Sequence, residues 1–229
     1  MCGIVGAVAE RNVAPILIQG LQRLEYRGYD SAGVAIVQSD GKVQRRREVG
    51  KVVNLSDNLE ADPVKGGLGI AHTRWATHGA VQQTNTHPHM SGNDLALVHN
   101  GIIENYMALR EELQSKGYVF ASETDSETIV HLIHSCLGDD GLLQAVRRAV
   151  KRLEGAYAIA VCWADEPDRI IAARSGCPLV VGKGIGENFL ASDVLALKAV
   201  TDRFIFLEEG DLVELRRDSI DIWSIDNEA

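Results

Sequence analysis

The last third of the chain carries the pattern that most restricts its fold. Seven short segments between residues 156 and 225 have the composition of β-strands, and turn residues such as those at 165–168 separate most of them. One short helix, expected at 194–200, interrupts the run. The strands are expected at 156–164, 169–175, 178–184, 187–192, 203–210, 211–217 and 219–225.

The chain also begins with strand patterns. A strand is expected at 2–9, and a helix follows in which Asn12 is the cap and Pro15 lies in the first turn. Gly28 ends this helix, because glycine is favoured just beyond a helix C-terminus. Two further strands are expected on either side of the turn at 39–42.

The middle of the chain is mainly helical. A short buried strand is expected at 94–99, and a helix at 105–116. The next helix opens with a capping box in which Thr124 is the cap and Glu127 reaches back to it. The basic residues of a last helix, near 142–153, fall mostly on its polar face and favour a solvated surface over a binding patch: Arg147, Arg148, Lys151 and Arg152.

Strands grouped at both ends of a chain, with helices between them, are typical of an α+β layered domain with largely antiparallel sheets. They do not suit the regular strand–helix alternation of a Rossmann array. The 229 residues are 45% apolar, enough to fill a large core, and no linker, low-complexity tract or internal repeat divides them. We therefore expect one α+β domain.

Charge and cysteine content narrow the class of partner. A net charge of −9 argues against a nucleic-acid or anionic-membrane surface, so small molecules or proteins are expected instead. No segment has the ~18 consecutive apolar residues of a membrane span or the form of a signal peptide, which predicts a cytoplasmic protein. The four cysteines have no CxxC spacing, which disfavours a disulfide framework or a zinc ribbon.

Cys2 allows two interpretations. A cysteine inside an apolar strand is ordinarily a small buried hydrophobe. If Met1 is removed, however, Cys2 carries a free α-amine that titrates near ~7.7–8.0 and can accept the thiol proton. Nucleophile and general base would then be on one residue.

Two polar segments contain arginine beside aromatic residues. In residues 26–33 (YRGYDSAG), a helix stop and a turn explain most positions but not Arg27 between two tyrosines, where a guanidinium could stack and hold backbone carbonyls. In residues 72–79 (HTRWATHG), a polar loop is the simple interpretation. The functional one is a loop with Arg74 as a carboxylate clamp, Trp75 as a lid and Gly79 as a hinge.

Two further sites have a structural and a functional interpretation. Asn100 and Gly101 form a turn signal, but an asparagine NH2 and an adjacent glycine N–H can also converge on one oxyanion. Asp125 suits the first turn of its helix and would equally suit a substrate ammonium. Five of the seven histidines lie between positions 72 and 99, yet their spacing fits no common zinc motif, so no metal is expected.

Together these motifs resemble the class II glutamine amidotransferases, whose domains are N-terminal nucleophile hydrolases. The resemblance rests on CGIVG, YRGYDSAG, GIAHTRWATHG, THPH, VHNGIIEN and SETDSE, and covers residues 2 to about 225. Within that family the chain is similar to the glutaminase domain of the glutamine–fructose-6-phosphate aminotransferases. The resemblance implies a four-layer sandwich of two antiparallel β-sheets between helical layers, with no cofactor.

The resemblance also implies residue roles. Cys2 would attack the side-chain amide of L-glutamine, and Asn100 and Gly101 would form the oxyanion hole. Arg74 would bind the α-carboxylate and Asp125 the α-ammonium. The other positions that it implies are Trp75, Thr77 and His78 in a loop that closes over glutamine, and Arg27 and His87 as supporting residues.

Residues 1–225 are expected to be the glutaminase domain, and 226–229 the start of a linker to a sugar-phosphate isomerase part that this chain lacks. The expected reaction is hydrolysis of glutamine to glutamate and ammonia; with the isomerase part, the ammonia would convert fructose 6-phosphate to glucosamine 6-phosphate. One alternative is a regulatory module that binds glutamine without turnover. Another is the glutaminase domain of a different amidotransferase branch.

Overall fold

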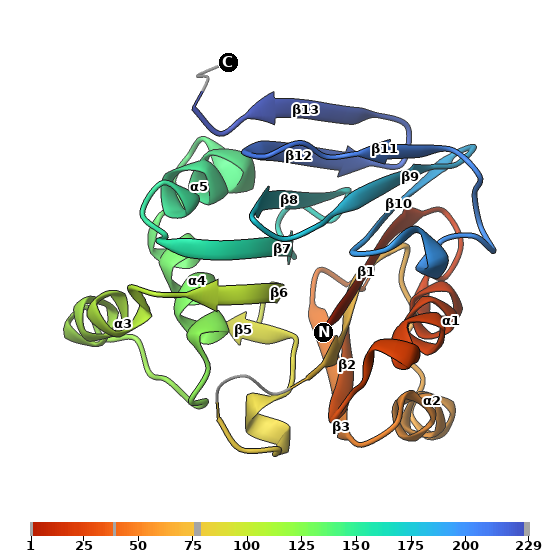
Figure 1. The fold of residues 1–229 in the computed structure, drawn as a ribbon, viewed down its shortest axis with the longest axis horizontal. Coiled ribbons are helices and arrows are strands. Elements are labelled where there is room, and N and C mark those ends of the chain that lie inside the picture. The colour runs from red at the N-terminus through yellow and green to blue at the C-terminus, as the bar shows by residue number, and fades with distance from the viewer. Residues whose placement is uncertain (1, 39, 76–78, 227–229) are drawn as a thin grey trace.

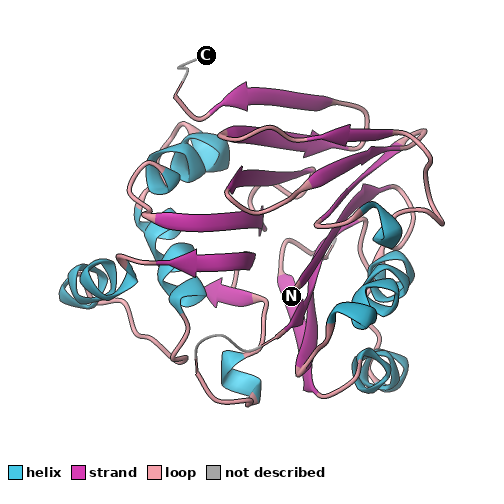
Figure 2. Cartoon of the chain, in the orientation of Figure 1, coloured by secondary structure: helices cyan, strands magenta, loops and turns pink. Residues whose placement is uncertain are grey.

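The computed structural model describes residues 2–38, 40–75 and 79–226. These residues form two β-sheets packed face to face, with helices on both outer faces (Figures 1 and 2). Helices α1 and α2 cover one sheet, and α3, α4 and α5 cover the other (Figure 1). The four-layer arrangement confirms the expected α+β sandwich. No helix in the described ranges is both long and apolar enough to cross a membrane.

The first sheet has seven strands, in the order β11-β9-β10-β1-β4-β2-β3. Every pair of neighbours is antiparallel. Strand β1 lies in the middle, between a strand from the first half of the chain and one from the second. The strands are β1 (Gly3–Ala9), β2 (Ser31–Val37), β3 (Val43–Val49), β4 (Leu68–Arg74), β9 (Val180–Lys183), β10 (Glu187–Ala191) and β11 (Phe204–Phe206).

The second sheet has six strands, in the order β13-β12-β8-β7-β6-β5, and its ladders are also antiparallel. All seven strands expected after residue 155 are present, distributed over the two sheets. The short helix expected at 194–200 is a 3-10 turn, Val194–Ala196. The strands are β5 (His89–Ser91), β6 (Leu95–Ile103), β7 (Gly155–Trp163), β8 (Arg169–Ser175), β12 (Asp211–Arg216) and β13 (Ile220–Ser224).

Strand β1 shows why the core has three layers. Ile4 and Val8 point toward the second sheet, while Val5, Ala7 and Ala9 point toward the helices on the outer face. Both faces are buried, so β1 is apolar along its whole length rather than alternating. The second sheet packs in the same way against its own helices.

The helices are α1 (Ala14–Leu24), α2 (Val52–Ala61), α3 (Tyr106–Ser115), α4 (Asp125–Ser135) and α5 (Gly141–Val150). Helix α1 begins one residue after Val13, but Asn12 Oδ1 still accepts the Ala14 N–H at 3.3 Å. The chain leaves this helix through the short 3-10 turn Glu25–Arg27 and the positive φ of Gly28. The expected helix start is therefore confirmed to within two residues, whereas α1 itself ends at Leu24 and only the 3-10 turn extends to Gly28.

Four details differ from the sequence interpretation. Two are elements that the sequence patterns do not predict, helix α2 and strand β4. Thr124 caps α4 by accepting the Glu127 N–H, but the Glu127 carboxylate accepts from the Ala121 and Ser122 N–H groups instead of reaching back to the cap. Arg147 is buried, at 3% exposed, and does not lie on the solvated side of α5.

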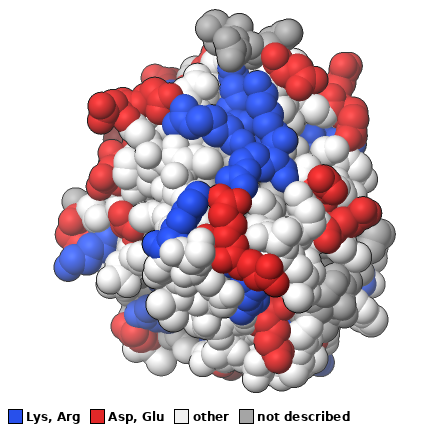
Figure 3. Space-filling model, turned by 90° about the vertical axis from the view of Figure 1, so that its left-hand side faces the viewer, with Lys and Arg blue, Asp and Glu red and all other residues white. Residues whose placement is uncertain are grey.

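The rest of the basic run on α5 is exposed, as expected. Arg148 pairs with Asp140, and Arg152 pairs with Glu112 of α3. Figure 3 shows this side of the molecule, where basic side chains lie next to acidic ones. Arg148 and Arg152 are thus neutralised locally, as on an ordinary solvated face.

Candidate active site

A cavity of about 670 Å³, which we call the main cavity, lies at one end of the sandwich, and four of the chain segments that line it carry expected site residues. Cys2 precedes β1, and Arg74 is the last residue of β4. These two positions are neighbours because β1 and β4 are antiparallel, with Gly3 opposite Thr73. The other two segments are the end of β6 and the start of α4, so that residues far apart in sequence share the main cavity.

Cys2 lies in the wall of this cavity with its sulfur against the backbone of Trp75. The Trp75 N–H donates to Sγ at 3.1 Å, and the thiol donates to the Trp75 carbonyl at 3.4 Å. Burial raises the pKa of the Cys2 thiol, although the Trp75 N–H acts in the opposite direction. At Gly3, an added Cβ would lie 2.7 Å from Thr73 Oγ1, so the residue after the thiol must be small for β1 to approach β4.

Asn100 and Gly101 lie within β6, so the interpretation of this pair as a turn is wrong. Gly101 has a φ of +129°, and a Cβ there would lie 1.9 Å from the Ala156 carbonyl oxygen, which only glycine avoids. Asn100 Nδ2 donates one N–H to the Cys2 carbonyl at 3.3 Å. Its second N–H has no partner within the described ranges, and the residue lines the cavity.

His72 holds the other end of the Asn100 amide. Its Nε2 lies 3.0 Å from Asn100 Oδ1, and since that oxygen can only accept, Nε2 carries the proton. The ring is 1% exposed, and burial lowers the pKa of His72 to about 3, so it stays neutral. His72 therefore turns the amide NH2 toward Cys2, a role that sequence reasoning missed because it counted this residue only among possible metal ligands.

Arg74 is 3% exposed at the end of β4. Its Nη1 donates to the Ala80 carbonyl and Nη2 to the Gly79 carbonyl, both at 3.2 Å. Asp30 Oδ1 lies 3.5 Å from Nη1. Residues 72–74 are thus strand, which corrects the polar-loop interpretation, and the chain turns away only after Arg74.

Trp75 is half-exposed and packs over Gly28, where an added Cβ would lie 1.9 Å from the indole ring. The glycine of the YRGYDSAG motif therefore leaves space for the tryptophan of the second motif. Thr77 and His78, expected in the same loop, lie outside the described residues.

Asp125 is the first residue of α4 and is 4% exposed. Its Oδ2 accepts the backbone N–H of Ile103 at 2.9 Å, and Ser126 Oγ lies 3.4 Å from Oδ1. These contacts tie the start of α4 to the end of β6, and the carboxylate lines the main cavity. The wall thus carries a cation at Arg74 and an anion at Asp125 around a thiol.

The two supporting residues also line this cavity. Arg27 pairs with Asp193 and lies 5.7 Å from the centre of the Tyr26 ring, which agrees with the expected aromatic contact. His87 stacks on His72 with ring centroids 4.0 Å apart.

Four of the clustered histidines pack together at the cavity, where His87 and His99 line the wall: His72, His87, His89 and His99. His87 Nδ1 accepts the His99 N–H at 3.3 Å, and burial lowers the pKa of His87 well below its ordinary value. Burial lowers the pKa of His89 to about 3, so His72, His87 and His89 are neutral in this cluster. In the described part of the chain, no group of three or more His, Cys, Asp or Glu side chains is arranged to hold a metal ion.

Comparison with known proteins identifies relatives over the whole chain. The family described as "Glutamine amidotransferase domain" matches residues 72–199, more than half of the sequence. A glutamine–fructose-6-phosphate aminotransferase (isomerizing) from Pseudomonas putida is 64% identical over 97% of this chain and 37% of its own length. The protein of the same name from Haemophilus influenzae is 60% identical over 97% of this chain and 37% of its own length. The chain spans little more than a third of these relatives.

Solved structures share the fold. The glutamine phosphoribosylpyrophosphate amidotransferase of B. subtilis superimposes with a TM-score of 0.84 at 26% identity, over 98% of this chain and 49% of that one. A glutamine aminotransferase class-II domain protein from Silicibacter pomeroyi has a TM-score of 0.68 at 16% identity, over 99% of this chain and 100% of its own, which shows the fold alone. The expected N-terminal nucleophile hydrolase sandwich is confirmed. This chain belongs to the glutamine amidotransferase domain family.

Proposed function

We propose that this domain hydrolyses the side-chain amide of L-glutamine to glutamate and ammonia, with Cys2 as the nucleophile. The observation that carries the proposal is the convergence of Cys2, Arg74, Asn100, Gly101 and Asp125 on one cavity. An α-amino acid presents a carboxylate, an ammonium and a side chain, and the cavity offers a cation, an anion and a thiol.

In the proposed reaction, the Cys2 thiolate attacks the amide carbon of glutamine, and its carbonyl oxygen becomes an oxyanion. The free N–H of Asn100 and the Gly101 N–H stabilise that oxyanion, a contribution of ~2.7–4 kcal/mol for one such donor. The C–N bond then breaks, and ammonia leaves with the proton that the thiol gave up, so a γ-glutamyl thioester remains. Water attacks the thioester, glutamate leaves, and the thiol takes back a proton.

The base for this reaction is proposed to be the α-amine of Cys2 after removal of Met1. Within the described ranges, Sγ forms hydrogen bonds only with the backbone of Trp75, so no histidine is placed to take its proton. His72 and His87 use ring nitrogens in other contacts. An amine on the same residue can always reach the thiol proton, and its pKa lies near neutral pH.

Arg74 is proposed to bind the α-carboxylate and Asp125 the α-ammonium of glutamine. Trp75, Thr77 and His78 would belong to the segment that covers the bound amino acid. Arg27 and His87 would support the wall, His87 by its stacking on His72.

We extend the proposal to a longer protein on the basis of the names that the relatives carry. There the ammonia would be used to make glucosamine 6-phosphate from fructose 6-phosphate, in a sugar-phosphate isomerase part that is a partner of this domain. Residues 1–225 would be the glutaminase domain and 226–229 would begin the linker, of which 227–229 lie outside the described residues. A cytoplasmic location fits this metabolic role.

A glutamine-mimicking electrophile such as a diazoketone tests the nucleophile. Two of the four thiols share the main cavity, Cys2 and Cys177, so Cys177→Ser is the matched control for Cys2→Ser. We expect one adduct on the N-terminal peptide of the wild type and of C177S, and none on C2S. Labelling that persists in C2S and disappears in C177S would refute the assignment.

A glutamine-binding module without turnover is the second candidate. The raised pKa of the Cys2 thiol favours it for any chain that keeps Met1, because the amine is then no longer on the nucleophile. Intact mass and glutamate release, measured on the same sample, distinguish the two. Equal turnover with and without Met1 would exclude the α-amine of Cys2 as the general base.

A further inference from the structure

A second cavity, of about 250 Å³, opens where the edges of the two sheets meet. Strand β3 is the last strand of the first sheet, and β5 is the last strand of the second. Arg45 and Arg47 of β3 form one wall, and His89 of β5 with Glu127 and His131 of α4 form the other. We call this space the edge cavity. It lies behind the main cavity, since His89 packs against His87 with ring centroids 4.6 Å apart.

The two arginines point into the edge cavity because they alternate along β3. Arg46, between them, points to the opposite face and pairs with Asp62. Arg45 Nη1 donates to the Pro88 carbonyl at 3.2 Å, and Arg47 Nη1 donates to two further backbone carbonyls. In residues 2–38, 40–75 and 79–226, neither guanidinium has a carboxylate within 4.0 Å. Nε and Nη2 of both have no hydrogen-bond acceptor there.

Glu127 is the acidic group of this cavity, but its oxygens are already occupied. They accept the N–H groups of Ala121 and Ser122 at 2.9 and 2.7 Å, and the Ser122 hydroxyl at 2.6 Å. One carboxylate therefore faces two guanidinium groups. Burial lowers the pKa of Arg47 to about 10, which still leaves it protonated at neutral pH. The cavity has an excess positive charge.

His131 lies in the opposite wall of the edge cavity. The residue is 5% exposed, and its Nδ1 lies 2.9 Å from Ser91 Oγ. Its Nε2 is buried and has no hydrogen-bond partner among the described residues, and Glu127 Oε1 is 3.8 Å away.

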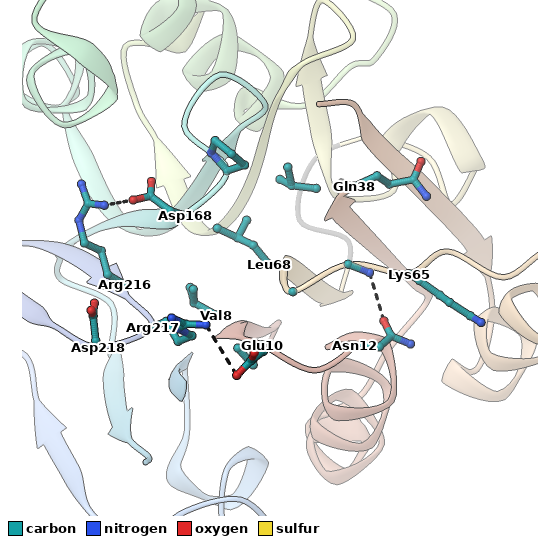
Figure 4. Close-up of a pocket in the computed structure, with 15 residues that line it drawn as sticks. Val8, Glu10, Asn12, Gln38, Lys65, Leu68, Asp168, Arg216, Arg217 and Asp218 are labelled. Atoms are coloured by element: carbon teal, nitrogen blue, oxygen red, sulfur yellow. Dashed lines mark hydrogen bonds and ion pairs between the residues drawn. The ribbon is translucent and has the colours of Figure 1, made fainter. Parts of the chain in front are cut away.

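A third cavity, larger than the edge cavity, shows by contrast that the charge of the edge cavity is unusual. It has a volume of about 610 Å³, lies at the far end of β1 and is lined by three basic and three acidic side chains (Figure 4). Its arginines already have acidic partners: Arg216 pairs with Asp168, and Arg217 lies 3.8 Å from Glu10. The charges there are balanced, whereas those of the edge cavity are not.

We propose that the edge cavity binds a tetrahedral oxyanion, either inorganic phosphate or the phosphate group of a small monoester. Two guanidinium forks on β3 line the same cavity, and together they carry more N–H donors than one planar carboxylate can accept, which suits the several oxygens of a tetrahedral anion. A volume of about 250 Å³ admits the phosphate group with a few further atoms. The bound anion would lie between β3 and α4 at the edge of the sandwich.

Isothermal titration calorimetry at fixed ionic strength tests the proposal, with inorganic phosphate and glycerol 3-phosphate as separate ligands and chloride as the balancing anion. The test variant is R45Q/R47Q, and R46Q is the matched control, with a charge removed from the same strand but from its other face. We expect saturable 1:1 binding to the wild type and R46Q, weakened at least about tenfold in R45Q/R47Q. The ligand that binds more tightly shows whether the cavity binds inorganic phosphate or the phosphate group of a monoester.

An NMR titration of the wild-type histidine rings locates the site without relying on a variant. We expect saturable shifts of the His131 ring signals with phosphate, and no comparable shift of His134, three residues along α4. The absence of saturable binding would overturn the proposal. So would equal binding by R45Q/R47Q, or an unmoved His131 signal.

Discussion

The contact between His72 and Asn100 leads to a quantitative prediction about the proposed oxyanion hole. Replacing His72 by Leu keeps the volume but removes the Nε2–H that fixes the amide at 3.0 Å. If only the net ~1 kcal/mol of one hydrogen bond is lost, kcat falls about fivefold. If the amide turns its oxygen toward the substrate, the whole donor is lost and the fall reaches ~10²–10³.

The effect should fall on kcat and leave KM for glutamine near its wild-type value, because Arg74 and Asp125 are unchanged. Glutamate release is the assay, on protein whose mass shows that Met1 is absent. The Asn100 oxygen left without its donor should also cost ~1–3 kcal/mol of stability, or ~2–4 °C in Tm per kcal/mol.

Two further variants complete the test. His72→Gln can still donate to Asn100 and should restore part of kcat. His134→Leu removes a histidine of α4 that lies outside the main cavity and is hydrogen-bonded to Tyr118 at 2.7 Å. This variant should leave kcat unchanged. A kcat for H72L within twofold of wild type would refute the positioning role.

Three other predictions follow from the same site. Arg74→Ala should raise KM for glutamine about 10- to 150-fold, as expected for ~1.5–3 kcal/mol of charge-assisted binding, and an unchanged KM in steady-state assays would exclude the contact. Gly101→Ala should lower the free energy of unfolding in urea by more than Gly117→Ala. Both have positive φ, but a Cβ at Gly101 would lie 1.9 Å from a β7 carbonyl, whereas one at Gly117 meets nothing within 4 Å. In the chain that keeps Met1, alkylation of Cys2 should accelerate with rising pH and have its midpoint above the usual ~8.5, because burial raises the thiol pKa. Mass spectrometry measures the alkylation rate, and a midpoint below neutral pH would contradict this prediction.

The strands after residue 155 could be predicted because each is a short apolar run between turn residues. Strand β4 could not, since it is buried on both faces yet contains His72, Thr73 and Arg74, so its sequence shows neither alternation nor a continuous apolar run. Helix α2 was missed for a related reason. Only Val52 and Leu55 are buried in it, which is too few for a helical period to be visible.

The candidate site shows a similar division. Cys2, Arg74, Asn100 and Asp125 were chosen from motifs, and the structure brings them into one cavity, although their roles stay predictions. The contact of His72 with Asn100 joins strands of different sheets. No local pattern reports such a pair, because it depends on how the two sheets are packed.

The central place of β1 has a consequence for how the protein folds. This strand is enclosed by β4 on one side and by β10 on the other, and the Ile4 N–H donates to Ser192 Oγ across a separation of 188 residues. Contacts over such distances close late and slow the search for the native state. The pairing of β1 is therefore completed only after β10 has been synthesised, and a fragment that ends before β10 would leave the thiol on an open sheet edge.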